Sequence, residues 1–463
     1  MGNHTSAEYR ESECEVTLSD SLGSIRGIQY DGQSCRYANI PYAKPPIGSL
    51  RWRKPQPLEP GFSYTLPDGG AFDGTKLGNV CPQPTYTSIG AKKHSFSEDC
   101  LRLNIWTPSQ TPETGKRWPV VVWFHGGWFQ VGDPSHDMSM NPIEFVRETG
   151  AIFVAVGYRL NMFGFLSGTA LLEESNGTGA GNFGLWDQRL GMDWVYGKIS
   201  AFGGDPENII LAGRSAGAYA VQAQALYDFR GSMDSGERNH FRRLIMYSNA
   251  IPAQPKTVAE CDEQFQEICD FFKIPQAASS SEKLRLLRAI PAEDLTAAIM
   301  SLRNHTFRPV TDNDFFHDGM VEYFKSGTFA AEFKKRGLRL LVSEMLNEES
   351  LYGATNGPEA SKESLKMQVS NYYSKACTTR LLEYYPAPHS DDKKDWASVF
   401  GRIISDGQVR VPSRFIVDNL TEHGVDIKDI WRYLVAYRLS FITDKVAPAS
   451  FGVTHSMDKP LWK

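Results

Sequence analysis

The chain has 463 residues, of which 41% are hydrophobic and 22% charged, and its 54 acidic and 49 basic side chains leave a net charge of −5. This composition is typical of globular proteins. The charge balance shows no basic stripe of the kind that phosphate binding needs, so we expect no nucleic-acid partner. No apolar run approaches the roughly 18 residues of a membrane-spanning helix, and we expect no membrane span.

The N-terminal segment is polar. Residues 1–16 read MGNHTSAEYRESECEV and lack the apolar core of a secretory signal, which predicts a cytoplasmic protein, or a secreted one if the true N-terminus is missing. Met1, Gly2 and Ser6 match the short N-myristoylation pattern, with an ordinary flexible start as the alternative. We expect residues 1–15 to form a flexible N-terminus and residues 16–463 a single domain, because no repeat or long linker divides them.

The chain has seven cysteines, an odd number, so at least one of them has no disulfide partner within the chain. They are Cys14, Cys35, Cys81, Cys100, Cys261, Cys269 and Cys377. Cys81 and Cys100 bracket a loop with prolines, serines and a glycine, as a disulfide-tied loop would, and no Cys or His spacing suggests zinc. The Asn-x-Thr sequences at Asn3, Asn176, Asn304 and Asn419 matter only if the chain enters the secretory route.

Short, nearly continuous apolar runs predict strands that are buried on both faces of a mostly parallel sheet. They are residues 101–106, 120–124, 152–158, 208–212, 243–247, 338–343 and 433–437. Helical patterns lie between them, including residues 218–227, 258–272, 281–289 and 358–373. The alternation predicts a layered α/β fold, with the Gly/Pro-rich region before Cys100 wrapping the edge of the sheet.

One apolar run leads directly into a nucleophile elbow. Residues 208–217 read NIILAGRSAG, and a helix-forming stretch follows. In a G-x-S-x-G turn between a strand and a helix, the serine stands at a sharp apex, and the glycines avoid a clash with neighbouring elements. The pattern alone is common, but this setting predicts that Ser215 is a catalytic nucleophile.

A serine nucleophile also needs a base and a site for the developing oxyanion. His125, Gly126, Gly127 and Trp128 follow the run 120–124, where such hydrolases place a loop whose N–H groups face the oxyanion. We therefore predict an oxyanion hole formed by Gly126, Gly127, Trp128 and Ala216. His125 directly precedes the glycines, a position that suits a role in holding the loop rather than in catalysis.

Longer segments carry a family resemblance. Residues 97–106 (SEDCLRLNIW) and 202–218 (FGGDPENIILAGRSAGA) resemble the two signature segments of the type-B carboxylesterase/lipase (cholinesterase-like) family. Three further segments add to the resemblance: residues 39–50 (NIPYAKPPIGSL), 158–166 (YRLNMFGFL) and 181–194 (GNFGLWDQRLGMDW). The sequences of the motifs look most like those of filamentous-fungal members, several of which serve secondary metabolism. The resemblance implies an α/β-hydrolase fold, a mostly parallel central sheet flanked by helices, ester hydrolysis through an acyl-serine, and no cofactor or metal.

The resemblance also implies an acid and a base. Residues 343–351 (SEMLNEESL) place Glu348 at the family's acid, with Glu349 as the rival in the position of its usual glycine. Residues 452–460 (GVTHSMDKP) supply His455 as the base. The chain order of serine, acid and histidine is that of α/β-hydrolases.

Several positions depart from the family pattern. Trp128 replaces a glycine of the oxyanion loop, and its indole either restricts the shape of the substrate or packs outward without effect. Arg214 replaces a usual Glu or Gln, and it either favours an anionic substrate or pairs with a buried carboxylate. We expect Trp128, Phe129 and Arg214 to bind substrate.

Two further departures concern the ends of the pattern. We expect the chain, which stops eight residues after His455, to lack the family's C-terminal helix region, and this puts in doubt how firmly the base is held. Cys81 and Cys100 match the family's first disulfide, but Leu286 stands where a partner of Cys269 is expected, and we favour reduced thiols.

We therefore predict a serine carboxylesterase that hydrolyses a small or medium organic ester. The predicted partner is thus a small-molecule substrate, with a lactone or a secondary-metabolite ester among the options. One alternative is an acyltransferase with the same triad. The other is a catalytically inactive, cholinesterase-like binding protein, which the retention of Ser215, Glu348 and His455 disfavours.

Overall fold

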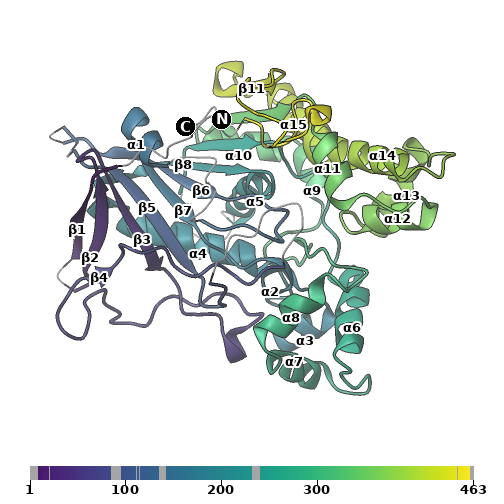
Figure 1. The fold of residues 1–463 in the computed structure, drawn as a ribbon, viewed down its shortest axis with the longest axis horizontal. Coiled ribbons are helices and arrows are strands. Elements are labelled where there is room, and N and C mark those ends of the chain that lie inside the picture. The colour runs from purple at the N-terminus through teal and green to yellow at the C-terminus, as the bar shows by residue number, and fades with distance from the viewer. Residues whose placement is uncertain are drawn as a thin grey trace.

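The computed structural model describes residues 9–19, 21–84, 95–110, 112–113, 115–134, 142–231, 240–445 and 447–458. Within these residues, one sheet of eleven strands runs through the molecule in the order β1-β2-β3-β5-β7-β6-β8-β9-β10-β11, with β4 beside β2 (Figure 1).

The N-terminal part of the sheet is antiparallel. Its strands are β1 (Glu11–Ser19), β2 (Gly23–Tyr30), β3 (Ser34–Pro41) and β5 (Arg102–Pro108), and the short β4 (Phe72–Asp73) pairs in parallel with β2. The expectation of a flexible segment up to residue 15 is wrong from residue 11 onward, because these residues pair with β2. Residues 1–8, with the predicted myristoylation pattern, lie outside the described residues.

The remaining strands are parallel to one another. They are β7 (Ile152–Val156), β6 (Trp118–Phe124), β8 (Gly204–Arg214), β9 (Arg243–Tyr247), β10 (Arg339–Met345) and β11 (Ile430–Val435). Each overlaps an apolar run identified in the sequence, so the predicted mostly parallel sheet is confirmed. Their carboxyl ends lie at one edge, where α/β proteins form their binding sites.

Helices cover the sheet on both faces (Figure 1). Their bounds are α1 Pro142–Thr149, α2 Asn161–Phe165, α3 Thr169–Glu174, α4 Phe183–Lys198, α5 Ala216–Gly231, α6 Asp262–Phe271, α7 Ser280–Arg288, α8 Ala292–Ile299, α9 Met320–Lys325, α10 Thr328–Lys335, α11 Glu349–Asn356, α12 Lys362–Ser370, α13 Lys375–Tyr384, α14 Lys393–Ser405 and α15 Val411–Glu422. The alanine-rich α5, which follows the predicted nucleophile, is buried along most of its length, so it is apolar on nearly all sides.

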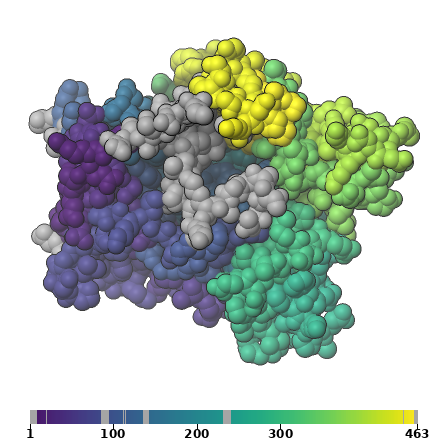
Figure 2. Space-filling model, in the orientation of Figure 1, coloured from purple at the N-terminus to yellow at the C-terminus, as the bar shows by residue number. Residues whose placement is uncertain are grey.

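Helices α11 to α14, residues 349–405, form what we call the helical lobe. The lobe projects from one side of the molecule, opposite the N-terminal strands, and a second group of helices, α6 to α8, lies below it (Figures 1 and 2). It has an apolar cluster of its own, which includes Tyr352, Leu365, Tyr372 and Phe400. Trp128 packs against this cluster from the sheet side, so the lobe adjoins the predicted oxyanion loop.

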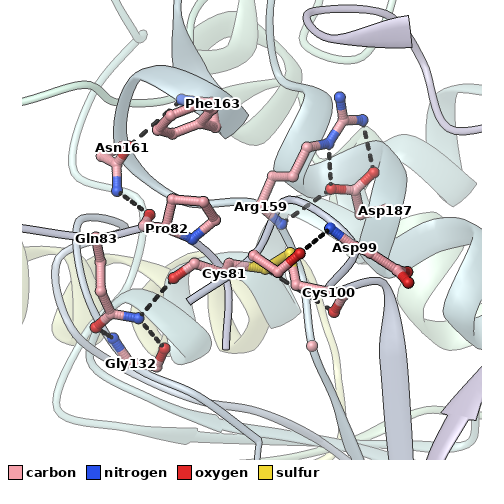
Figure 3. Close-up of a disulfide and its surroundings, with 12 residues drawn as sticks. Cys81, Pro82, Gln83, Asp99, Cys100, Gly132, Arg159, Asn161, Phe163 and Asp187 are labelled. Atoms are coloured by element: carbon pink, nitrogen blue, oxygen red, sulfur yellow. Dashed lines mark hydrogen bonds and ion pairs between the residues drawn. A yellow bond between two sulfur atoms is a disulfide. The ribbon is translucent and has the colours of Figure 1, made fainter. Parts of the chain in front are cut away.

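A disulfide joins Cys81 to Cys100, whose Cα atoms are 5.1 Å apart (Figure 3). The reduced thiols that we favoured for this pair are therefore wrong for this structure. The other described cysteines, Cys14, Cys35, Cys261, Cys269 and Cys377, are free.

The disulfide loop is bonded to the end of the predicted oxyanion loop. The Gln83 side chain donates to the Cys81 carbonyl over 3.1 Å and to the Gly132 carbonyl over 2.9 Å, and it accepts the Gly132 N–H over 2.9 Å (Figure 3). Nearby, Asn161 Nδ2 donates to the Pro82 carbonyl over 2.9 Å. The disulfide thus fixes a segment that supports Gly132.

We predict that Cys81→Ser combined with Cys100→Ser lowers the free energy of unfolding by about 3 kcal/mol, because the crosslink restricts a short loop of the unfolded chain. Denaturant unfolding without reductant measures the change. Cys14→Ser with Cys377→Ser, which removes two free and partly exposed thiols, is the matched control and should cost about 1 kcal/mol or less. Equal losses in the two double variants would contradict the prediction.

Candidate active site

Ser215 stands in a strained turn between β8 and α5. Its φ is +56°, in the left-handed region, and its side chain is almost fully buried. A Cβ on Gly217 would lie 1.9 Å from the Phe124 carbonyl oxygen, and one on Gly213 would lie 2.4 Å from the Gly217 carbonyl. Any larger residue at either glycine would push the helix from the strands, so the steric reason given for the G-x-S-x-G motif holds here.

The loop after β6 lies against this turn. A Cβ on Gly126 would lie 3.1 Å from the Ser215 Cβ and 2.8 Å from the Arg214 carbonyl oxygen. Among the described residues, no protein group accepts from the backbone N–H groups at positions 126, 127, 128 and 216. These donors are available to a ligand beside Ser215, as an oxyanion hole requires.

His125 holds the loop. Its ring stacks on Tyr158 with 4.4 Å between the centroids, and its carbonyl accepts the Tyr158 hydroxyl over 2.7 Å. Burial raises the pKa of Tyr158, so its hydroxyl stays a donor across the physiological range. His125 Nδ1 lies 2.9 Å from the Gly126 carbonyl oxygen. These contacts agree with the loop-holding interpretation of His125.

Glu348 and His455 form a buried pair. Glu348 Oε2 lies 2.5 Å from His455 Nδ1, and neither residue is more than 6% exposed. The other oxygen, Oε1, accepts the Met345 N–H over 2.8 Å, which fixes the carboxylate at the end of β10. The rival Glu349 is bonded to Arg410 instead, over 2.6 Å. Position 348 therefore carries the carboxylate that meets the imidazole.

The loop that carries His455 is held by its backbone. Asn347 N donates to the Val453 carbonyl over 2.9 Å, and Val453 N donates to Asn347 Oδ1 over 3.0 Å. A Cβ on Gly452, whose φ is +59°, would lie 2.2 Å from that same Asn347 oxygen. Arg438 donates to the Gly452 carbonyl over 2.8 Å. These bonds hold the backbone of the histidine loop against the end of β10.

Arg214 and Asp458 join the serine turn to the histidine loop. Arg214 Nη2 lies 3.1 Å from Asp458 Oδ2, and the two residues are 1% and 0% exposed. The guanidinium also lies over the Tyr247 ring at 5.2 Å, and the Tyr247 carbonyl accepts the Ser215 N–H over 2.8 Å. The buried-carboxylate alternative for Arg214 is confirmed, and its predicted contact with substrate is wrong because the side chain cannot reach the solvent.

The predicted substrate residues Trp128 and Phe129 differ in their placement. Phe129 is fully buried against Phe165 and Tyr219, at ring distances of 4.8 and 5.5 Å, so the prediction that it binds substrate is wrong. Trp128 is partly exposed, and its indole packs against the helical lobe. Both have a positive φ, so the simple alternation of a strand does not apply to them.

Ser215 and His455 are not directly bonded in this structure. Among the described residues, no hydrogen bond joins Ser215 Oγ to the imidazole, while the bond between His455 and Glu348 is formed. In the absence of substrate, catalytic hydrogen bonds are often long and become short in the substrate complex. The ring of Tyr352 lies 5.3 Å from that of His455 and limits how the imidazole can move.

Sequence reasoning missed Asp458 and Gln130. Asp458 lies in the histidine segment, and a buried arginine beside the nucleophile requires such a carboxylate, so a signal for it existed. Gln130 bonds the backbone of Phe307 in both directions, over 2.5 and 3.1 Å. No sequence pattern distinguishes this glutamine from a surface residue.

The described residues hold no group of three or more His, Cys, Asp or Glu side chains that could bind a metal ion. They also hold no helix that combines the length and the apolar character needed to cross a bilayer.

Comparison with known proteins gives the family. A family model described as the carboxylesterase family matches residues 12–462. The chain belongs to the carboxylesterase family. Its α/β-hydrolase fold and its class, the carboxylic ester hydrolases, follow from this membership, and the resemblance noted in the sequence is confirmed.

Relatives with esterase names support this class. An uncharacterized esterase/lipase of Schizosaccharomyces pombe is 41% identical over 440 residues, which cover 92% of this chain and 79% of the relative. A carboxylic ester hydrolase of Gibberella moniliformis is 35% identical over 97% of this chain and 83% of its own. Acetylcholinesterase of Bungarus fasciatus is 27% identical over 96% of this chain and 72% of its own.

We predict that Gly217→Ala abolishes ester hydrolysis and lowers the free energy of unfolding by about 1–3 kcal/mol or more, because the added methyl group overlaps the Phe124 carbonyl. Gly197→Ala, in the exposed part of α4, is the control. A Cβ there meets no atom within 4 Å, so this change should leave activity intact and stabilise the protein by up to about 1 kcal/mol. Hydrolysis of 4-nitrophenyl butyrate and thermal unfolding measure both effects. Full activity in Gly217→Ala would contradict the steric argument.

Proposed function

We propose that the protein hydrolyses a small or medium organic ester through a covalent acyl-serine intermediate on Ser215. The contact between Glu348 Oε2 and His455 Nδ1 carries the proposal, because it gives the imidazole a fixed orientation with its other nitrogen left for a nucleophile. The strained position of Ser215 beside unused N–H donors supports it.

The first half of the reaction acylates the serine. His455 takes the proton of Ser215 as Oγ attacks the carbonyl carbon of the ester, and Glu348 stabilises the imidazolium that forms. The negative charge on the tetrahedral intermediate is bound by the N–H groups of Gly126, Gly127 and Ala216, with Trp128 as a further donor. His455 then protonates the leaving alcohol as its bond to the carbonyl carbon breaks.

The second half uses water as the nucleophile. His455 removes a proton from water, which attacks the acyl carbon, and Ser215 leaves with that proton. This step releases the acid product and regenerates the free serine. Because water and the three side chains carry out both halves of the reaction, no cofactor is needed. Because a partly exposed indole stands in the oxyanion loop, we assign Trp128 the role of limiting the shape of the ester. Within this class of substrate, a lactone or a secondary-metabolite ester is a prediction. A cytoplasmic location of the protein is a separate prediction.

The role of Ser215 is tested by covalent labelling. We expect a fluorophosphonate probe to label the protein and Ser215→Ala to remove both the label and esterase activity, with kcat lower by about 10⁴-fold or more. Gel fluorescence and a 4-nitrophenyl ester assay report the two effects. Intact protein that binds esters without being labelled would support a binding protein instead, and transfer of the acyl group to an added alcohol would support an acyltransferase.

Adjacent glutamates give a matched test of the acid. Glu348→Gln should lower kcat by about 10³–10⁴-fold, because an amide no longer stabilises the imidazolium or its tautomer. Glu349→Gln loses only a partly exposed ion pair with Arg410 and should change kcat less than about twofold. Steady-state hydrolysis measures both. A larger loss in Glu349→Gln than in Glu348→Gln would transfer the role to Glu349.

A further inference from the structure

A narrow pocket lies between the segments that flank helices α6 to α8 and the helical lobe, and the described residues that line it include two cations and no acid. Its volume is about 40 Å³, roughly three times the space that one water molecule needs. Residues 252–256, residues 306–310 and the segment 371–377 of the lobe form its walls, and Tyr219 and Gln408 close it. Among the described residues that line it, only Lys256 and Arg308 have charged side chains, and Lys256 also borders an adjoining hollow that contains Glu260 and Glu263.

Neither cation is neutralised within the described residues. No carboxylate oxygen lies within 4.0 Å of the Lys256 ammonium or the Arg308 guanidinium, although ion pairs are frequent elsewhere on the molecule. Arg308 Nη2 donates to Gln408 Oε1 over 2.8 Å, and the guanidinium lies over the ring of Tyr372 at 5.0 Å. These neutral contacts fix the guanidinium in place, but they leave its charge available to an anion.

The surroundings increase the cost of this unpaired charge. Burial lowers the pKa of Lys256, Cys261 and Glu260 partly oppose this shift, and the neighbouring Arg308 adds to it. The Tyr373 hydroxyl accepts from Gln408 over 3.1 Å, and its proton remains for another acceptor. An anion between the two cations would relieve their repulsion and receive this proton as a hydrogen bond.

The pocket touches the first turn of α5, the helix that follows Ser215. Tyr219, which lines it, is one turn of α5 after Ser215, about 6 Å along the axis, and its N–H donates to the Ser215 carbonyl. Gln130 of the oxyanion loop bonds the backbone of Phe307, the residue before Arg308, on both sides. The cations are thus fixed relative to both the nucleophile and the oxyanion loop.

We propose that the esters hydrolysed by this enzyme carry a carboxylate, which binds between Lys256 and Arg308 while the ester carbonyl lies at Ser215. This inference rests on the proposed function and adds the substrate class. The charge belongs either to the acyl part, as in a monoester of a dicarboxylic acid, or to the alcohol part, as in an ester of a hydroxy acid. The pocket would bind the same carboxylate group in either case. Two pairs of substrates, one for each position of the carboxylate, therefore distinguish the two possibilities.

The test compares esters that differ only in charge. The acyl pair is 4-nitrophenyl hydrogen glutarate and its methyl-capped neutral form, and the alcohol pair is 3-carboxyphenyl butyrate and its methyl ester. We expect kcat/KM to favour the anion by about tenfold or more in one pair, as a charge-assisted bond allows, and to lose the preference at high ionic strength. Equal kcat/KM values within both pairs would overturn the proposal.

Charge variants assign the preference to the two cations. Arg308→Gln and Lys256→Met should each lower kcat/KM for the anion about tenfold while the neutral ester, which also reports on folding, changes less than about twofold. Arg308→Lys keeps the charge and should keep most of the preference. Lys362→Met and Arg380→Gln remove exposed cations elsewhere on the lobe and should have no effect. An unchanged preference in both pocket variants would overturn the assignment.

Binding without turnover separates this inference from the proposed function. In the Ser215→Ala protein, glutarate should raise the melting temperature, and Arg308→Gln should abolish the rise. If no ester is hydrolysed but glutarate still binds in this way, the proposed function fails and the anion pocket stands. Glutarate binding without a preference for anionic esters would overturn the substrate assignment, and absence of glutarate binding would overturn the pocket.

Discussion

The buried ion pair between Arg214 and Asp458 is the contact on which the assembly of the site depends. It joins the residue before the nucleophile to a residue in the histidine loop, and 244 positions of sequence separate the two. Each charge alone would be strongly destabilising in a dry interior, because an unpaired buried ion loses its hydration without compensation. Together they make the elbow and the histidine loop dependent on each other. The loop after β11, which a parallel bridge between Asn347 and Thr454 already joins to the end of β10, is thereby also placed beside the elbow.

The other supports of the site act on the oxyanion loop. Its glycines allow the backbone to lie against Ser215, while Gln83 holds the far end through Gly132 and Gln130 joins the middle to Phe307. Side-chain amides serve well in this role because each can donate and accept at once. Among the described residues, none of the bonds that hold the loop uses the backbone N–H groups at positions 126, 127 and 128.

Much of this arrangement could be predicted from the sequence. The parts that could not be predicted share one cause. Buried parallel strands produce apolar runs, and the elbow requires glycines, so the sheet and Ser215 have local signals. The direction of Phe129, the carboxylate that meets Arg214, and the strand pairing of residues 11–15 depend on packing between segments far apart in the chain. The pocket between Lys256 and Arg308 is the strongest case, because its walls come from segments far apart in the chain and none of them has a pattern of its own.

The helical lobe connects these features. Trp128 of the oxyanion loop packs against its apolar cluster, and Tyr352, from its first helix, lies beside His455. The same lobe supplies Tyr372 and Tyr373 to the wall of the cationic pocket, whereas Lys256 and Arg308 come from the segments that flank helices α6 to α8. A carboxylate bound there would contact both parts and stabilise their packing. Because that packing also positions the indole and limits the imidazole, binding energy from the distant end of the substrate would order the groups that act on its ester carbonyl.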